Sequence, residues 1–166
     1  MSGLKIIARI ATLALAPALL CQQPLIDFSQ RPAPSPAAVE FLSPDRITVP
    51  AGKRTTVALH FRIAPGLHIN SHAPRDPDLI PANLSIPDGT GLRLLEVLYP
   101  PGTEYALPID PKTKLSVYSG EFTLQARILA AAGTHSIQAA LRYQACDQNA
   151  CMPPKTIAVT LEVTGK

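Results

Sequence analysis

Four segments of the chain alternate apolar with polar or small side chains. In the first, Val57, Leu59 and Phe61 occupy every second position. A period of two is typical of an antiparallel strand with one buried face and one face in water. The four segments are Thr55–Ile63, Glu121–Ile128, His135–Tyr143 and Thr156–Val163.

Shorter apolar runs between these segments add further strands. They are bounded by turn signals such as Pro50-Ala51-Gly52 and Pro100-Pro101-Gly102. No stretch sustains an apolar period of 3.6 residues, so we expect no helix. Seven to nine short strands over roughly 125 residues indicate an all-β fold, an antiparallel β-sandwich in a single domain. The shorter strands are expected at Arg46–Val49, Asn83–Ile86, Arg93–Tyr99 and Lys114–Tyr118.

The N-terminal residues are typical of an export signal followed by a linker. Lys5 and Arg9 precede an uncharged apolar run that is too short to span a bilayer. Residues 1–21 are therefore expected to be the signal, 22–38 a proline-rich linker and 39–166 the folded domain. Cys21 also permits a lipid anchor, although Leu20 stands where lipoprotein signals carry a small residue. We expect a periplasmic or secreted protein, in a compartment where disulfides persist.

Charge gives no support for nucleic-acid binding. The net charge is +3, and two of the 15 basic residues lie in the signal, which leaves about +1 for the mature chain. No basic run or interleaving of basic and aromatic residues appears. The sequence also carries no phosphate loop, nucleotide fingerprint or Ser–His–Asp order. We expect no nucleic acid, no small-molecule substrate and no bound cofactor.

Two cysteines lie in the connection between the last two regular strands. Cys146 and Cys151 are separated by four residues, and hairpin arms run side by side, so their sulfurs can reach disulfide distance. We expect them near the surface at one end of the sandwich, beside the stiff Pro153-Pro154 pair. A structural bridge and a redox-active pair remain equally open on these grounds. Because no helix N-terminus is at hand to lower a thiol pKa, a relay component fits better than a strong oxidant.

A metal site is a further alternative. His68 and His72 are four residues apart, and Met152 with the cysteines adds soft ligands that a copper or zinc carrier could use. Gly66 and Pro74 favour a loop or strand there, whereas this spacing would need a helix to bring the imidazoles together. We therefore predict no metal site and a structural role for His68.

Three motifs resemble the N-terminal periplasmic domain family of the thiol:disulfide interchange protein DsbD. Tyr143-Gln144-Ala145-Cys146 and Cys151-Met152-Pro153-Pro154 are similar to its cysteine signature. Gly66-Leu67-His68-Ile69-Asn70-Ser71 with Leu79-Ile80-Pro81-Ala82 is similar to a second segment. Tyr99-Pro100-Pro101-Gly102 with Val117-Tyr118-Ser119-Gly120 is a weaker third. Together they span roughly residues 40–165 in family order.

The resemblance implies an immunoglobulin-like sandwich whose cysteine pair cycles between dithiol and disulfide. It assigns the mixed disulfide with a partner to Cys151 and the resolving role to Cys146. Tyr143, Gln144, Met152, Pro153 and Pro154 would form the rim, with His68 and Asn70 in supporting positions. The implied partners are periplasmic thioredoxin-like proteins, including cytochrome c maturation factors, and a membrane electron donor, which must be a separate polypeptide. Glu104–Lys114, with Tyr105, Asp110 and Pro111, is the candidate for the family's cap loop.

Two alternatives belong to other classes of protein. The chain could be an immunoglobulin-like binding or scaffold domain whose disulfide is purely structural, or a copper or zinc carrier. The cysteine spacer is also one residue shorter than in the familiar form of the family, which could change the loop geometry and the reduction potential.

Overall fold

The computed structural model describes residues 37–42, 46–87, 89, 91–108 and 110–166. These residues belong to one compact unit of the chain. The predicted signal, Cys21 and nearly all of the predicted linker lie outside them, so those assignments stay predictions. Within the described residues no helix is long and apolar enough to cross a bilayer.

All regular structure in the described part of the chain is β-strand, as predicted. The four alternating segments and the four shorter apolar runs are all strands, with ends shifted by at most a few residues. Four further strands, β1, β4, β7 and β11, have only two to four residues each, too few to show a period. The strands are β1 (Val39–Phe41), β2 (Arg46–Val49), β3 (Arg54–Ile63), β4 (His68–Asn70), β5 (Asn83–Ser85), β6 (Leu92–Leu98), β7 (Thr103–Ala106), β8 (Lys114–Tyr118), β9 (Glu121–Ala130), β10 (Gly133–Tyr143), β11 (Ala145–Cys146) and β12 (Lys155–Gly165).

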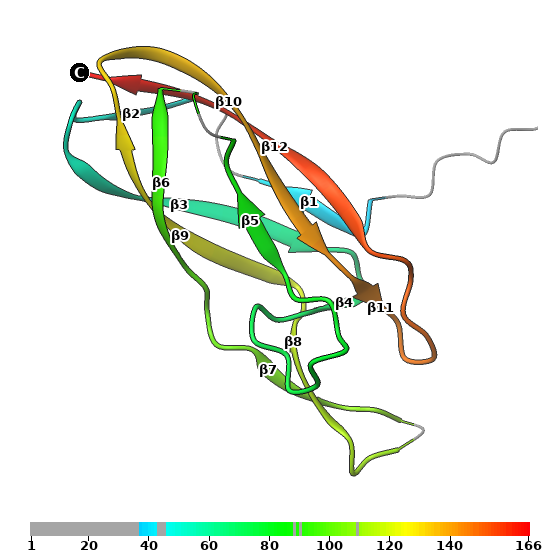
Figure 1. Cartoon of the computed structure of the whole chain (residues 1–166). Helices are drawn as coiled ribbons and strands as arrows, with labels where there is room; N and C mark the ends of the chain where they lie inside the picture. The colour runs from blue at the N-terminus through cyan, green and yellow to red at the C-terminus, as the bar shows by residue number, and fades with distance from the viewer. Residues whose placement is uncertain (1–36, 43–45, 88, 90, 109) are drawn as a thin grey trace, which may run out of the picture. The chain divides into compact units, whose positions relative to one another are not determined.

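Two four-stranded sheets enclose the core. Sheet A has the order β1-β3-β9-β6 and sheet B the order β2-β12-β10-β5 (Figure 1). The apolar positions of the four alternating segments point into one shared cluster, in which Phe61, Leu124 and Leu141 are fully buried. The period of two therefore produces the sandwich, because every second side chain of each long strand faces the other sheet.

A third sheet lies at one end of the sandwich and was not predicted. Sheet C has the order β11-β4-β8-β7 and is built largely from the short strands (Figure 1). Pairing is antiparallel throughout the three sheets except between β2 and β12, which run parallel. The fold is the immunoglobulin-like sandwich that the sequence predicted, with sheet C added where the cysteine loop emerges.

Candidate thiol–disulfide site

The cysteine loop connects β10 to β12, as the sequence predicted. These strands pair along their whole length, down to Tyr143 opposite Lys155. Beyond Tyr143 the chain leaves sheet B, and β11 joins sheet C by placing Cys146 opposite His68 of β4. Cys146 and Cys151 then face each other in an isolated bridge, with Cα atoms 3.9 Å apart, and form a disulfide.

The two cysteines differ in their access to solvent. Cys146 is only 2% exposed, because its strand is paired in sheet C. Cys151 lies in the return segment and is exposed. The two cysteines lie together at one end of the sandwich, as expected, but only Cys151 is exposed. Only one of the two residues of the disulfide is therefore open to solvent.

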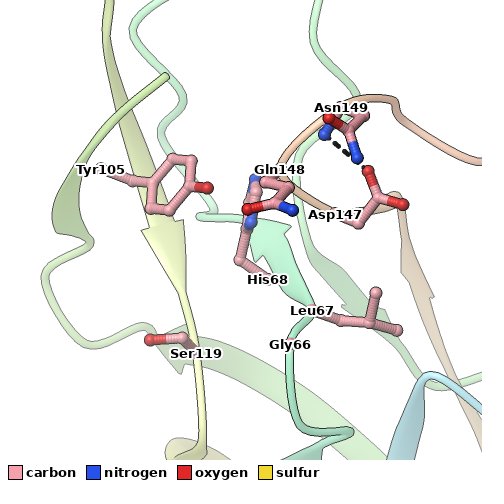
Figure 2. Close-up of a pocket in the computed structure, with 8 residues that line it drawn as sticks. All are labelled: Gly66, Leu67, His68, Tyr105, Ser119, Asp147, Gln148 and Asn149. Atoms are coloured by element: carbon pink, nitrogen blue, oxygen red, sulfur yellow. Dashed lines mark hydrogen bonds between the residues drawn. The ribbon is translucent and has the colours of Figure 1, made fainter. Parts of the chain in front are cut away.

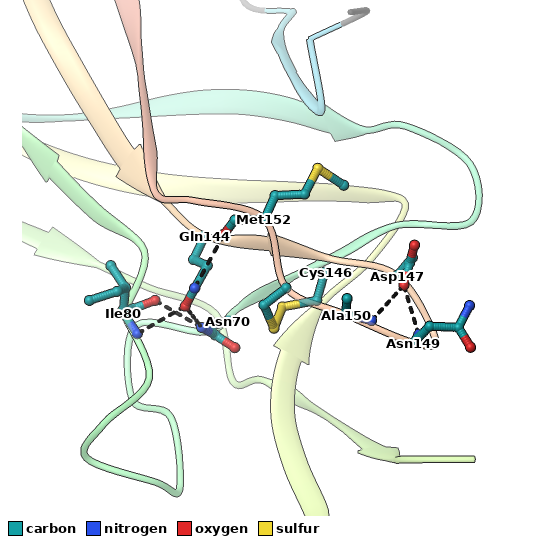
Figure 3. The surroundings of a disulfide bond; sticks show 9 residues. Asn70, Ile80, Gln144, Cys146, Asp147, Asn149, Ala150 and Met152 are labelled. Carbon is teal, nitrogen blue, oxygen red and sulfur yellow. Dashed lines mark hydrogen bonds between the residues drawn. A yellow bond between two sulfur atoms is a disulfide. The ribbon is translucent and has the colours of Figure 1, made fainter. Parts of the chain in front are cut away.

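The loop between the cysteines is held by its own turn. One carboxylate oxygen of Asp147 accepts hydrogen bonds from the backbone N–H groups of Asn149 (2.7 Å) and Ala150 (2.8 Å) (Figure 3). The N–H of Asp147 in turn donates to the carbonyl of Ala150. These bonds lower the pKa of Asp147, with a smaller contribution from the nearby His68. These bonds form an Asx turn that constrains the loop in addition to the disulfide.

A polar network lies behind the disulfide. The side-chain oxygen of Gln144 accepts from the Asn70 amide at 3.3 Å and from the Ile80 N–H, and its amide nitrogen donates to the Met152 carbonyl (Figure 3). Asn70, which is 0% exposed, also donates to the carbonyl of Ile80. Gln144 thus links both sides of the cysteine loop to the segment that follows β4.

The expected rim residues divide into three groups. Pro153 and Pro154 are exposed beside Cys151, whereas Met152 is half-buried and packs against the core. Gln144 faces inward into the polar network described above. Tyr143 does not lie on an exposed rim: it is 1% exposed and part of the core, because it falls on the inward face of β10. Burial raises the pKa of Tyr143, and a hydrogen bond with Val39 partly offsets this.

A surface pocket of about 490 Å³ adjoins the disulfide. Figure 2 shows the ring of Tyr105, from β7, facing His68, from β4, with the Asp147 loop on the opposite side; the two ring centres are 4.3 Å apart. Burial lowers the pKa of His68, and the charge of Asp147 partly opposes the shift. The pocket is lined by Gly66, Leu67, His68, Tyr105, Ser119, Asp147, Gln148 and Asn149.

His72 does not join His68. Its ring stacks on Tyr99 at 3.7 Å and its Nδ1 lies 3.0 Å from the Ala82 carbonyl, beside a different pocket. Among the described residues no group of three or more His, Cys, Asp or Glu side chains could hold a metal ion. Sequence reasoning missed the contact between Tyr105 and His68, because it depends on pairing between strands too short to show a pattern.

The β7–β8 hairpin carries the candidate cap segment. Tyr105 contacts His68 from this hairpin, and Glu104 bonds Arg75 at 2.9 Å and Lys114 at 3.1 Å. These two bonds, the one from Lys114 foremost, lower the pKa of Glu104. The hairpin is thereby tied both to its own second strand and to the loop after β4.

Fold and site together define a disulfide-bearing β-domain: an immunoglobulin-like sandwich with a disulfide in a loop at one end. Comparison with known families identifies the domain further. The family model "Thiol:disulfide interchange protein DsbD, N-terminal" matches residues 38–163. The chain therefore belongs to the family of DsbD N-terminal domains, which are periplasmic domains.

Solved structures give more distant likenesses. The reduced DsbD N-terminal domain of Neisseria meningitidis is 19% identical, with a TM-score of 0.46, over 69% of this chain and 82% of that one. AggA, the major subunit of aggregative adherence fimbriae type I from Escherichia coli, is 11% identical, with a TM-score of 0.32, over 77% of this chain and 94% of that one. A search of curated proteins finds no match. Family membership rests on the sequence match.

Proposed function

We propose that this domain is an electron relay that reduces partner proteins in the periplasm by thiol–disulfide exchange. In the reduced domain, the Cys151 thiolate attacks the disulfide of a partner and forms a mixed disulfide, which releases one partner thiolate. The Cys146 thiolate then attacks Cys151 Sγ, and the second partner thiolate leaves. Two electrons and two protons pass from the dithiol to the partner, and the Cys146–Cys151 disulfide forms.

The unequal exposure of the cysteines carries this proposal. Cys151 is exposed and Cys146 is 2% exposed, so a protein partner can approach the first sulfur and not the second. Exchange rates depend on which sulfur is accessible to attack. The role that family resemblance gives to each cysteine agrees with this difference. A purely structural disulfide does not require one of its cysteines to be exposed.

Family membership also suggests the partners. We propose thioredoxin-like periplasmic proteins as electron acceptors and a membrane-embedded electron donor. The exposed Pro153-Pro154 pair would form part of the docking rim. The β7–β8 hairpin would act as the cap, with Tyr105 against His68, the residue opposite the buried Cys146, and the Glu104 ion pairs holding the hairpin in place.

The first test uses reduced single-cysteine variants and a thioredoxin-like partner that lacks its resolving cysteine and carries its remaining cysteine as a mixed disulfide with thionitrobenzoate, which leaves as a coloured thiolate on exchange. Cys146→Ala should accumulate a mixed disulfide through Cys151, visible on a non-reducing gel, while Cys151→Ala should form none. Exchange by Cys151→Ala at the wild-type rate would overturn the assignment of roles.

The second test separates a relay from a structural bridge. We expect the reduction potential of the pair, measured by thiol trapping in graded redox buffers, to fall at roughly −120 to −270 mV with the fold intact in both states. A value below about −300 mV, together with unfolding on reduction, would instead identify a binding or scaffold domain with a structural disulfide.

A further inference from the structure

Two buried side-chain atoms in the described residues have no hydrogen-bond partner, and both belong to β4. They are Nε2 of His68 and Oδ1 of Asn70. The residues are 4% and 0% exposed, so water does not satisfy these atoms from the surface. Residues two apart in a strand point to the same face, so both atoms belong to one side of β4. Buried polar groups normally find a partner, and an exception calls for a functional explanation.

Cys146 lies on that face. It pairs directly with His68 between β11 and β4, and directly opposed residues of antiparallel strands have Cβ atoms about 4.5–5.5 Å apart. Asn70 lies two positions further along β4, where its amide nitrogen is fixed by Ile80 and Gln144. In the oxidised state Cys146 has no proton to donate. Reduction would create a thiol in a position that is 2% exposed, next to an unpartnered amide oxygen and an unpartnered imidazole nitrogen, which accepts when the ring proton is on Nδ1.

We propose that His68 Nε2 holds the proton of the Cys146 thiol in the reduced domain and removes it when Cys146 closes the disulfide. This inference rests on the exchange function proposed above. Asn70 Oδ1 is the second acceptor for the thiol proton before closure.

The step balances within the exchange reaction. In the mixed disulfide between Cys151 and a partner, the Cys146 proton passes to His68 Nε2. Cys146 Sγ then attacks Cys151 Sγ, the bond from Cys151 to the partner's sulfur breaks, and the partner leaves as a thiolate. His68 afterwards returns its proton to solvent or to the leaving thiolate.

The surroundings of His68 suit a neutral base. Burial lowers its pKa, although the charge of Asp147 opposes this, and the shift favours the neutral imidazole. The titratable groups that face it are Tyr105 from β7, Asp147 from the cysteine loop and Cys146 from β11. The Tyr105 ring, 4.3 Å away, covers the imidazole on the cap side. His68 is therefore placed to exchange a proton with Cys146 more readily than with bulk water.

The test follows the two halves of the reaction separately. The reduced domain is mixed with an equimolar amount of the aromatic disulfide dithiobis(nitrobenzoate), which releases one coloured thiolate at each step. The first release reports attack by Cys151 and depends on probe concentration. The second reports closure by Cys146 and does not. Atoms and electrons balance, because the dithiol becomes a disulfide and the probe becomes two thiolates.

We expect His68→Phe, which keeps a ring against Tyr105, to slow the second release at pH 7 by about 100-fold, the lower end of what a positioned general base contributes. The first release should be unchanged. The difference should shrink as the pH rises and Cys146 ionises without help. His72→Phe is the matched control, because His72 also stacks on a tyrosine but lies beside another pocket. It should alter neither release.

A second variant guards against misfolding. His68→Gln retains a polar group but no base, and it should also slow the second release; thermal melting of the oxidised form checks that each variant is folded. A second release at the wild-type rate in either folded variant would overturn the role of His68 and leave the exchange function standing. Absence of a second release in the wild type would instead overturn the exchange function itself.

Discussion

Reduction of the disulfide should leave the domain folded, at a small and calculable cost. The bridge joins cysteines five positions apart, and for so small a ring the loop-closure relation gives about 2 kcal/mol of stabilisation. The contacts that shape the loop do not depend on the bridge. They include the Asp147 turn and the bond from the Met152 N–H to the Ala145 carbonyl at 2.8 Å. We therefore expect the free energy of unfolding to fall by about 2 kcal/mol and the Tm by about 5–10 °C.

Urea unfolding of the wild type with and without a phosphine reductant measures the difference. The Cys146→Ala/Cys151→Ala double variant is the control, because the reductant should not change its unfolding. Asp147→Ala should destabilise the reduced form more than the oxidised form, since the turn is then the main remaining constraint on the loop. A loss above about 4 kcal/mol, or loss of cooperative unfolding on reduction, would refute the reasoning.

Three further predictions concern the supports of the site. Tyr143→Phe removes a buried hydroxyl that is hydrogen-bonded to Val39, and it should lower the free energy of unfolding by about 1 kcal/mol while leaving the exchange rate unchanged. A slower exchange rate would show that Tyr143 contributes to the reaction. Gly102→Ala places a Cβ against the side chains of Ser116 and Ser71 and should destabilise the domain by about 1–3 kcal/mol, measured by urea unfolding. Equal stability of the variant and the wild type would show that the neighbouring side chains move to accommodate the added methyl group. Because the pKa of Glu104 is lowered, its contribution to stability should be present above the ordinary pKa of a glutamate and be lost as the pH falls through the lowered value. NMR titration should show this depression in the wild type and less of it in Lys114→Met; an equal depression in both would exclude Lys114 as the main cause.

The sequence was sufficient to predict the sandwich because the long strands carry their own pattern. In β3, β9, β10 and β12 every second residue must be apolar, since one face of each is buried in a shared core. Sheet C was not predicted because two of its strands carry no such pattern. β4 is buried at all of its three positions and β11 has only two residues, so neither can show an alternation. Their existence depends on pairing with strands far away in sequence.

For the site, the sequence predicted that the two cysteines lie close together but not which of them is buried. Hairpin geometry brings the cysteines together, and this follows from the segments on either side. Which cysteine is buried depends on the pairing of β11 with β4, and no local feature of the sequence indicates it. The partial burial of Tyr105 against His68 has the same origin, because these residues are 37 positions apart and meet only through β8. Assembly of sheet C, more than the composition of the loop, makes the two cysteines unequal in exposure.

The direction of β12 determines where a label or fusion partner can be attached without blocking the cysteine loop. The strand starts beside the cysteine loop and ends at Gly165, where the C-terminus lies at the opposite end of the sandwich (Figure 1). Its 11 residues span about 35 Å at the usual rise of an extended chain. Lys166 is anchored there by backbone bonds to Val49 and Ala51. A fluorophore, surface tether or fused protein at the C-terminus would therefore leave Cys151 free to meet large partners.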